Sequence, residues 1–239
     1  MAAARQAWKV QPHGHLTQVD DNILTVTGTI LMPAGRIPRR MTVVRLGHGE
    51  LIIFSAMALA DEQMSELEAF GTPAYMIVPN DHHRLDARSW KERYPTLRVI
   101  APAGAREKVE KVVLVDATFG DFGDSSVRFV SVAGTGEKEA ALEVHGAQGT
   151  TLILNDLVGN IRGARGFSGW LLRLMGFAGD EPHIPLPIRR VLIESRGQVR
   201  EQLLTWAAMT SLRRILVSHG EPIEDDPRGA LRRLAQSIQ

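Results

Sequence analysis

The chain has 239 residues, with 28 lysines and arginines against 27 aspartates and glutamates, so its formal charge is +1. This balance excludes the strongly basic face that nucleic-acid binding requires, and the absence of cysteine excludes disulfides and thiolate-ligated metals. No apolar run approaches the roughly 20 residues that span a bilayer, and residues 1–14 lack the apolar core of a secretory signal. We therefore expect residues 1–239 to form a single cytoplasmic domain without a membrane span, and the basic run 36–40 to be solvated arginines.

The first half of the chain changes from extended runs to alternating strands and helices. A "GHG" turn at 47–49 joins two of the extended runs as a hairpin, and Asp61 is the expected N-cap of the first helix. Strand and helix then alternate, as they do in a sheet that helices cover. The strands are expected at 23–30, 41–46, 50–55, 74–78 and 97–102, and the helices at 61–71, 86–94 and 104–112.

The second half repeats this plan. The helix at 197–211 places Val199, Leu203, Trp206 and Ala207 on one stripe, and Asp226 with Pro227 begins the last helix. Two such halves predict an α/β fold, in which two mixed sheets pack together with helices outside as a four-layer αββα sandwich. The strands are expected at 126–133, 139–146, 150–156, 191–195 and 213–218, with an irregular insertion over 157–187.

Three of the predicted strands end in residues that bind metals. The strand 74–78 runs into "PNDHH", another ends in Asp156, and the last one is followed by His219. Sites in α/β sheets collect beyond the carboxyl ends of strands, and imidazole with carboxylate suits zinc, iron or manganese. Each ending is also an ordinary surface turn when it is taken alone. Their coincidence predicts a shared metal site.

With these strand ends, the sequence resembles the metallo-β-lactamase superfamily from about residue 23 to residue 223. "TLILNDLV" matches the strand of the family's bridging acid and gives Asp156, while "ILVSHGEPI" matches its late-histidine strand and gives His219. The resemblance implies the αββα sandwich, with a metal site at the edge between two similar halves.

The family's first signature, His-x-His-x-Asp-His, is eroded in this sequence. One reading places its first two histidines on Asn80 and His82, and a shifted reading places its Asp-His pair on Asp81 and His82. His82 is a ligand in both readings, and His83 is the natural substitute.

The family's "PGHT" turn corresponds to "VAGTGEKEA", where Glu137 is the replacement for the histidine. His145 lies within the next predicted strand rather than in that turn. The pattern resembles an uncharacterised branch of the superfamily with a "PN…HH" turn, a tryptophan in the next helix (Trp90) and a "YP" ending (Tyr94). Membership in that branch implies the fold and leaves the reaction open.

The resemblance leaves enough ligands for one metal ion. His82 or His83, with Asp156 and His219, supplies the three protein ligands of a catalytic zinc, which keeps one position for water. We expect a mononuclear hydrolase of a small molecule that uses zinc, iron or manganese. Asp81 or Asp86 would orient an imidazole or act as general base. The alternative is a metal-free, catalytically inactive member of the fold that serves as a binding or structural module.

The stretch 165–187 is rich in apolar residues between glycines. It contains Phe167, Trp170, Leu172, Met175 and Phe177. It fits a short helix packed on the body or an apolar lid over the cleft. It also fits a contact surface, in which case the protein would form a homodimer through residues 167–178. The sequence does not identify the substrate.

Overall fold

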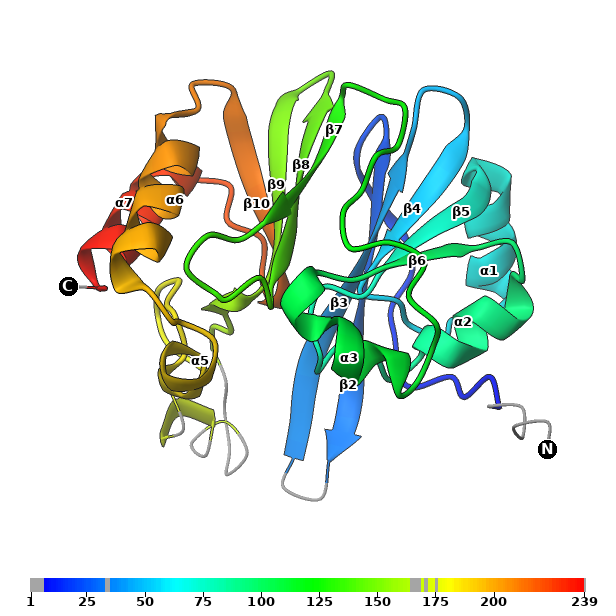
Figure 1. Ribbon diagram of the computed structural model, residues 1–239, viewed down its shortest axis with the longest axis horizontal. Coiled ribbons are helices and arrows are strands. Elements are labelled where there is room, and N and C mark those ends of the chain that lie inside the picture. The colour runs from blue at the N-terminus through cyan, green and yellow to red at the C-terminus, as the bar shows by residue number, and fades with distance from the viewer. Residues whose placement is uncertain (1–6, 33–34, 164–168, 170–171, 175, 239) are drawn as a thin grey trace.

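A computed structural model describes residues 7–32, 35–163, 169, 172–174 and 176–238. It contains two sheets that face each other across the centre of the molecule, with helices on both outer sides (Figure 1). The first sheet has the order β1-β2-β3-β4-β5-β6, antiparallel through β4 and parallel from there to β6. Its strands are β1 (Thr17–Asp20), β2 (Ile23–Met32), β3 (Gly35–Arg45), β4 (Glu50–Phe54), β5 (Thr72–Ile77) and β6 (Arg98–Ile100).

The second sheet has four strands in the order β10-β9-β8-β7. β10 is parallel to β9, and the other two pairings are antiparallel, so this sheet is also mixed. Its strands are β7 (Val127–Ser131), β8 (Ala140–Gly146), β9 (Gly149–Asn160) and β10 (Leu212–Gly220).

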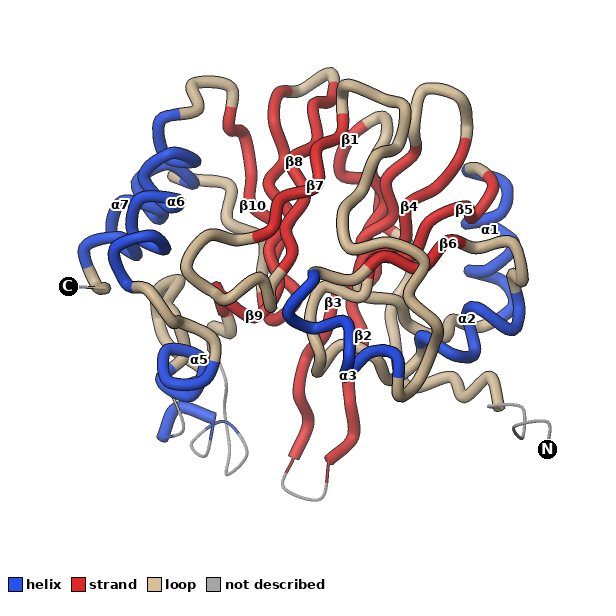
Figure 2. The backbone as a smooth tube through the Cα atoms, viewed as in Figure 1, coloured by secondary structure: helices blue, strands red, loops and turns tan. Residues whose placement is uncertain are grey.

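Helices cover the outer face of each sheet (Figure 2). Met64 of α1, Trp90 of α2 and Val109 of α3 are buried in the core of the first sheet. Val199 and Leu203 of α6 are buried in the core of the second, on the stripe that the sequence predicts. The helices are α1 (Asp61–Phe70), α2 (Ala87–Arg93), the short 3-10 turn η1 (Ala103–Ala105), α3 (Arg106–Glu110), α5 (Leu186–Val191), α6 (Arg196–Ala208) and α7 (Pro227–Gln236).

A third apolar core lies between the sheets. Val44 and Phe54 of the first sheet belong to the same buried cluster as Leu142, Ile153 and Leu216 of the second. Burial of apolar surface contributes about 25 cal/mol per Å², so this central layer stabilises the contact between the halves. The order helix, sheet, sheet, helix confirms the predicted αββα sandwich.

Two local predictions are wrong. Residues 191–195 do not form a strand, because α5 starts behind Pro185 with a proline in its first turn and runs into them. The carbonyl of Gly134 then accepts hydrogen bonds from the backbone of Glu194 and Ser195. The first helix begins behind Ala60, so Asp61 is its first residue rather than its N-cap.

The basic run 36–40 lies in β3 and is not solvated throughout. Arg39 and Arg40 are only 6% and 4% exposed. Arg40 donates to Thr25 Oγ1 and to the carbonyls of Val217 and Gly220, and thereby ties the first sheet to β10. Its burial lowers the pKa of its guanidinium, against the opposing charges of nearby glutamates. Arg40 is therefore a structural link between the sheets, while Arg36 at the start of the run is exposed.

Within the described part of the chain, no helix is long and apolar enough to cross a membrane.

Candidate metal centre

The loop behind β5 is shaped by the side chain of Asn80. Its Oδ1 accepts hydrogen bonds from the backbone N–H groups of His82 and His83, at 2.9 and 3.1 Å. Such a bond from an asparagine to the backbone two residues on is a stable turn of its own. The turn reverses the chain directly after the strand and points the two histidines in different directions.

Asp156 lies in an irregular part of β9. Val217 of β10 pairs with Leu154, but His219 pairs with Gly159, so residues 155–158 bulge opposite Ser218. A bulge redirects side chains that a regular ladder would point to alternate faces. β9 continues to Asn160 rather than ending at Asp156, so the first residues of the expected 157–187 insertion belong to the strand.

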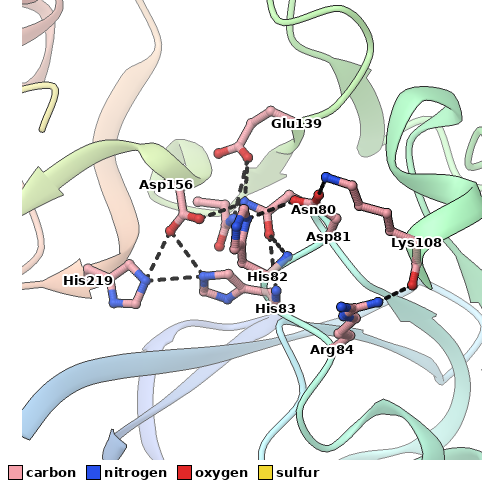
Figure 3. Close-up of polar contacts among 10 residues, drawn as sticks. Asn80, Asp81, His82, His83, Arg84, Lys108, Glu139, Asp156 and His219 are labelled. Atoms are coloured by element: carbon pink, nitrogen blue, oxygen red, sulfur yellow. Dashed lines mark hydrogen bonds and ion pairs between the residues drawn. The ribbon is translucent and has the colours of Figure 1, made fainter. Parts of the chain in front are cut away.

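The bulge and the turn bring one atom each from His83, Asp156 and His219 together (Figure 3). The two Nε2 atoms lie 3.1 Å apart, and Asp156 Oδ1 lies 3.1 Å from His83 Nε2 and 3.0 Å from His219 Nε2. A tetrahedral zinc with bonds of about 2.0–2.1 Å holds its ligand atoms about 3.3 Å apart. The triangle is therefore only slightly tighter than the one that a zinc ion would impose.

Both imidazoles are held from behind through their Nδ1 atoms. His219 Nδ1 lies 2.7 Å from the carbonyl oxygen of Pro38, and His83 Nδ1 lies 2.7 Å from Ser55 Oγ. A carbonyl only accepts, so His219 carries a proton on Nδ1, and its neutral form aims the lone pair of Nε2 at the carboxylate. Lone pair and carboxylate repel each other unless a proton or a metal cation lies between them.

The electrostatics of the cluster favour a carboxylate with at least one neutral imidazole. Burial lowers the pKa of His83, while Asp156 opposes this shift. Burial also disfavours charged His219, but the hydrogen bond and charge of Asp156 outweigh it and raise the pKa of His219. For Asp156, burial is outweighed by both histidines, which hold its pKa well below the usual value. Neutral imidazole and ionised carboxylate are the forms that bind metal.

A second buried carboxyl group, Glu139, lies behind the cluster. Asn80 Nδ2 donates to Asp156 Oδ2 at 2.7 Å and to Glu139 Oε2 at 3.0 Å (Figure 3). Glu139 Oε1 accepts from the backbone N–H of Leu157 in the bulge at 3.0 Å. Burial, followed by the charge of Asp156, raises the pKa of Glu139 to about 8. The sequence analysis missed this residue and named Glu137 two positions earlier.

His82, the ligand expected in both readings of the eroded signature, lies outside the cluster. Its side chain is 67% exposed, and its Nδ1 lies 2.8 Å from Asp81 Oδ1. Lys108 pairs with the other oxygen of Asp81 at 2.5 Å. His83 takes the place in the cluster, and Asp81 orients His82 rather than a histidine of the triangle.

Asp86, the other expected orienting carboxylate, is occupied by Arg39. The two form an ion pair of 2.7 Å in which both side chains are 6% exposed. Burial raises the pKa of Asp86, although Arg39 opposes the shift. No hydrogen bond described for its carboxylate goes to an imidazole.

The remaining candidates are remote from the cluster. Glu137 is exposed in its turn, with a φ of 55°. His145 lies in β8, where its Nδ1 is 3.0 Å from Thr150 Oγ1. Neither belongs to the group of ligand atoms around Asp156.

A cavity of about 410 Å³ adjoins the cluster, and His83, Asp156 and His219 form part of its wall. Leu172 and Phe177, from the apolar segment of the sequence analysis, line it together with Ile188 of α5. Phe167, Trp170, Leu171 and Met175 lie outside the described residues, and the dimer expected through 167–178 stays a prediction.

Comparisons with known proteins identify the fold. No protein-family model and no curated protein matches the sequence. The solved structure of the metallo-β-lactamase FIM-1 from Pseudomonas aeruginosa, in its mono-zinc form, matches with a TM-score of 0.62 at 13% identity, over 97% of this chain and 98% of that one. The DIM-1 metallo-β-lactamase exposed to ceftazidime matches with a TM-score of 0.64 at 12% identity, over 97% and 100% of the two chains. A metallo-β-lactamase from Hirschia baltica gives 0.60 at 12% identity, over 94% and 98%.

The chain therefore adopts the metallo-β-lactamase fold, over nearly its whole length and that of these structures. This confirms the fold that the short sequence motifs implied.

Proposed function

We propose that the protein is a hydrolase that works with a single transition-metal ion held by His83, Asp156 and His219. The observation that carries the proposal is the triangle of Nε2, Oδ1 and Nε2 atoms, 3.0–3.1 Å apart, on the wall of an apolar cavity. Two imidazoles and one carboxylate are a ligand set of catalytic zinc sites, which keep a fourth position open. The mono-zinc form of a structure with the same fold is consistent with a single ion.

Bound there, such an ion would polarise a substrate oxygen and lower the pKa of water in the open position to about 7. The chain's own residues fix the ligands: Ser55 and Pro38 hold the imidazoles, and Asn80 holds the second oxygen of Asp156. These outer contacts set which nitrogen faces the ion and which carries the proton. His82 lines the cavity and has Asp81 behind its Nδ1 atom, so this imidazole suits proton transfer to and from a bound substrate.

The described residues offer no comparable ligands for a second ion. Asn80, at the position of the family's first histidine, uses its side chain for the turn and for two carboxyl groups. Among the residues that the structure describes, His83, Asp156 and His219 are the one group of three or more ligands close enough to hold a metal. We therefore expect a stoichiometry of one.

Metal analysis of untagged protein tests the proposal. The wild type should contain about one equivalent of zinc, iron or manganese per chain, and His83→Ala, Asp156→Ala and His219→Ala should each lose it. His82→Ala is the matched control, since His82 is a neighbouring histidine outside the triangle, and it should retain the ion.

Two results would contradict the proposal: wild-type protein that takes up no stoichiometric metal even after incubation with zinc, or equal loss in the His82→Ala control. The first would favour the metal-free binding module. Hydrolysis of a panel of esters, measured before and after chelation, then tests the reaction itself.

A further inference from the structure

The cavity beside the triangle has its polar side chains in one region and apolar residues along the rest of its described wall. All the polar side chains among its described lining residues belong to His82, His83, Asp156 and His219. The rest of the described wall is apolar or glycine, and comes from the β2–β3 hairpin, the end of β9 with Ile161, the residues Leu172, Phe177 and Pro185, and α5. Ile37, Val158, Leu172, Phe177 and Ile188 represent these segments. A ligand there would meet polar side chains in one region and apolar side chains along the rest of the described wall.

The described lining contains no lysine and no arginine. The nearby Arg39 is paired with Asp86, and Lys108 with Asp81. A phosphate or carboxylate in the apolar part would lose its hydration without a partner, at a cost of several kcal/mol or more. The apolar part therefore suits an uncharged group, which argues against phosphodiesters.

The volume limits the size of that group. A methylene group occupies about as much space as a water molecule, about 30 Å³. The cavity of about 410 Å³ therefore holds about fourteen such groups, enough for an ester group and an acyl chain of about eight to ten carbons. This is the lower part of the range for pockets that enclose small organic ligands.

From these observations, and resting on the proposed function, we infer that the substrate is an uncharged carboxylic ester with a hydrocarbon acyl chain of about eight to ten carbons. Its carbonyl lies against His83, Asp156 and His219, and its chain lies against Leu172, Phe177 and Ile188. In the reaction, the oxygen of water bonds to the carbonyl carbon and the carbon–oxygen bond to the alcohol breaks. The proton of water passes to the departing alkoxide, so the products are a carboxylic acid and an alcohol.

A binding series on the metal-free protein tests the acyl site separately from the metal. Protein treated with a chelator is titrated by calorimetry with neutral amides from butanamide to decanamide. About 0.8 kcal/mol per buried methylene predicts a Kd that falls about fourfold with each carbon. The fall should level off near eight to ten carbons, when the cavity is full. Octanoate should bind much more weakly than octanamide, because its carboxylate would lie against Asp156, and the described lining contains no lysine or arginine to compensate.

Two variants test where the acyl chain of the ligand lies. Phe177→Ala should weaken the binding of octanamide about tenfold and leave the binding of butanamide unchanged. Ile188→Lys should weaken the binding of octanamide and strengthen that of octanoate, which can bind in the reverse orientation with its carboxylate against the introduced ammonium group. A misfolded protein would lose both ligands. His145→Ala should keep the whole amide series, since His145 lies in β8 and does not line this cavity.

A Kd that does not change with chain length, or octanoate that binds as tightly as octanamide, would overturn the inference. Either result leaves the metal analysis untouched. Conversely, a protein that binds the amide series but takes up no metal supports the acyl cavity and overturns the hydrolase. In the zinc-loaded protein, kcat/KM for uncharged nitrophenyl esters should rise with acyl length over the same range.

Discussion

Ser55 is a small residue that supports the candidate metal centre. It follows β4 with a φ of 58°, is 4% exposed, and places its hydroxyl 2.7 Å from His83 Nδ1. A non-glycine residue in this left-handed region carries about 1–3 kcal/mol of strain, which persists only where the surroundings maintain it. Here the hydroxyl can hold the imidazole with Nε2 facing Asp156.

Ser55→Ala should therefore weaken zinc binding about 10–100-fold, the usual effect of removing a group that orients a ligand. Ser55→Gly should weaken it as much, because it also lacks the hydroxyl, but it should be more stable than the alanine variant since glycine adopts positive φ without strain. Competition with a chromophoric chelator measures the affinity, and urea unfolding measures the stability.

Glu137→Gly is the matched control, because Glu137 also has a positive φ of 55° but lies away from the cluster. It should leave zinc affinity unchanged. Equal zinc affinity in wild type and Ser55→Ala would show that the hydroxyl does not position His83.

At the scale of the elements, the sequence predicts what depends on local pattern. Periodicity and turn residues predict most of the strands, though not β1, together with the stripe of α6 and the N-cap of α7, where Asp226 accepts from the backbone of Gly229. The errors arise where distant contacts decide. An apolar run at 191–195 fits a strand or a helix turn equally well, and the arginines of β3 are buried only because partners from other elements reach them.

The residues of the candidate site also fall into those that local pattern predicts and those that depend on distant contacts. Asp156 and His219 were predicted from the strand patterns, and the choice between His82 and His83 stayed open because it depends on the Asn80 turn. Glu139 and Ser55 carry no signal in the sequence, since each acts through residues far along the chain. A bulge that moves Asp156 out of the regular ladder is likewise defined only by its pairing with β10.

The end of β10 is the element that positions His219, and Gly220 determines its path. Gly220 has a φ of 112°, and a Cβ there would lie 2.1 Å from the carbonyl oxygen of Asn160 in β9. Gly220→Ala should lower the free energy of unfolding by about 2–4 kcal/mol, from strain and overlap together. It should also weaken zinc binding, because the backbone next to His219 must move.

Gly197→Ala in α6 is the control, as a Cβ there meets nothing within 4 Å. Alanine is the better helix residue, so this variant should be as stable as the wild type or slightly more stable. Urea unfolding and chelator competition compare the two variants. A Gly220→Ala protein with wild-type stability and zinc affinity would contradict the role assigned to this glycine.

For the whole molecule, the candidate metal centre lies where the two halves meet. His83 follows a strand of the first sheet, and Asp156 and His219 belong to the second. Pro38 and Arg40 of β3 reach across to β10 at the same place. A metal bound here links the sheets in the folded state and has no preformed site in the unfolded chain, so binding should stabilise the whole fold.

The expected size of this stabilisation follows from mass action. Zinc at 100 times its Kd adds about 2.7 kcal/mol to the free energy of unfolding, which for a chain of this length raises Tm by about 5–11 °C. Differential scanning calorimetry should show this shift in wild type and in His82→Ala, and no shift in Asp156→Ala. Magnesium at the same concentration should have little effect, because it prefers an octahedral set of oxygens to two imidazoles. A zinc-induced shift that survives in Asp156→Ala would mean that the stabilising ion binds elsewhere, and the link between the two halves would then not depend on the triangle.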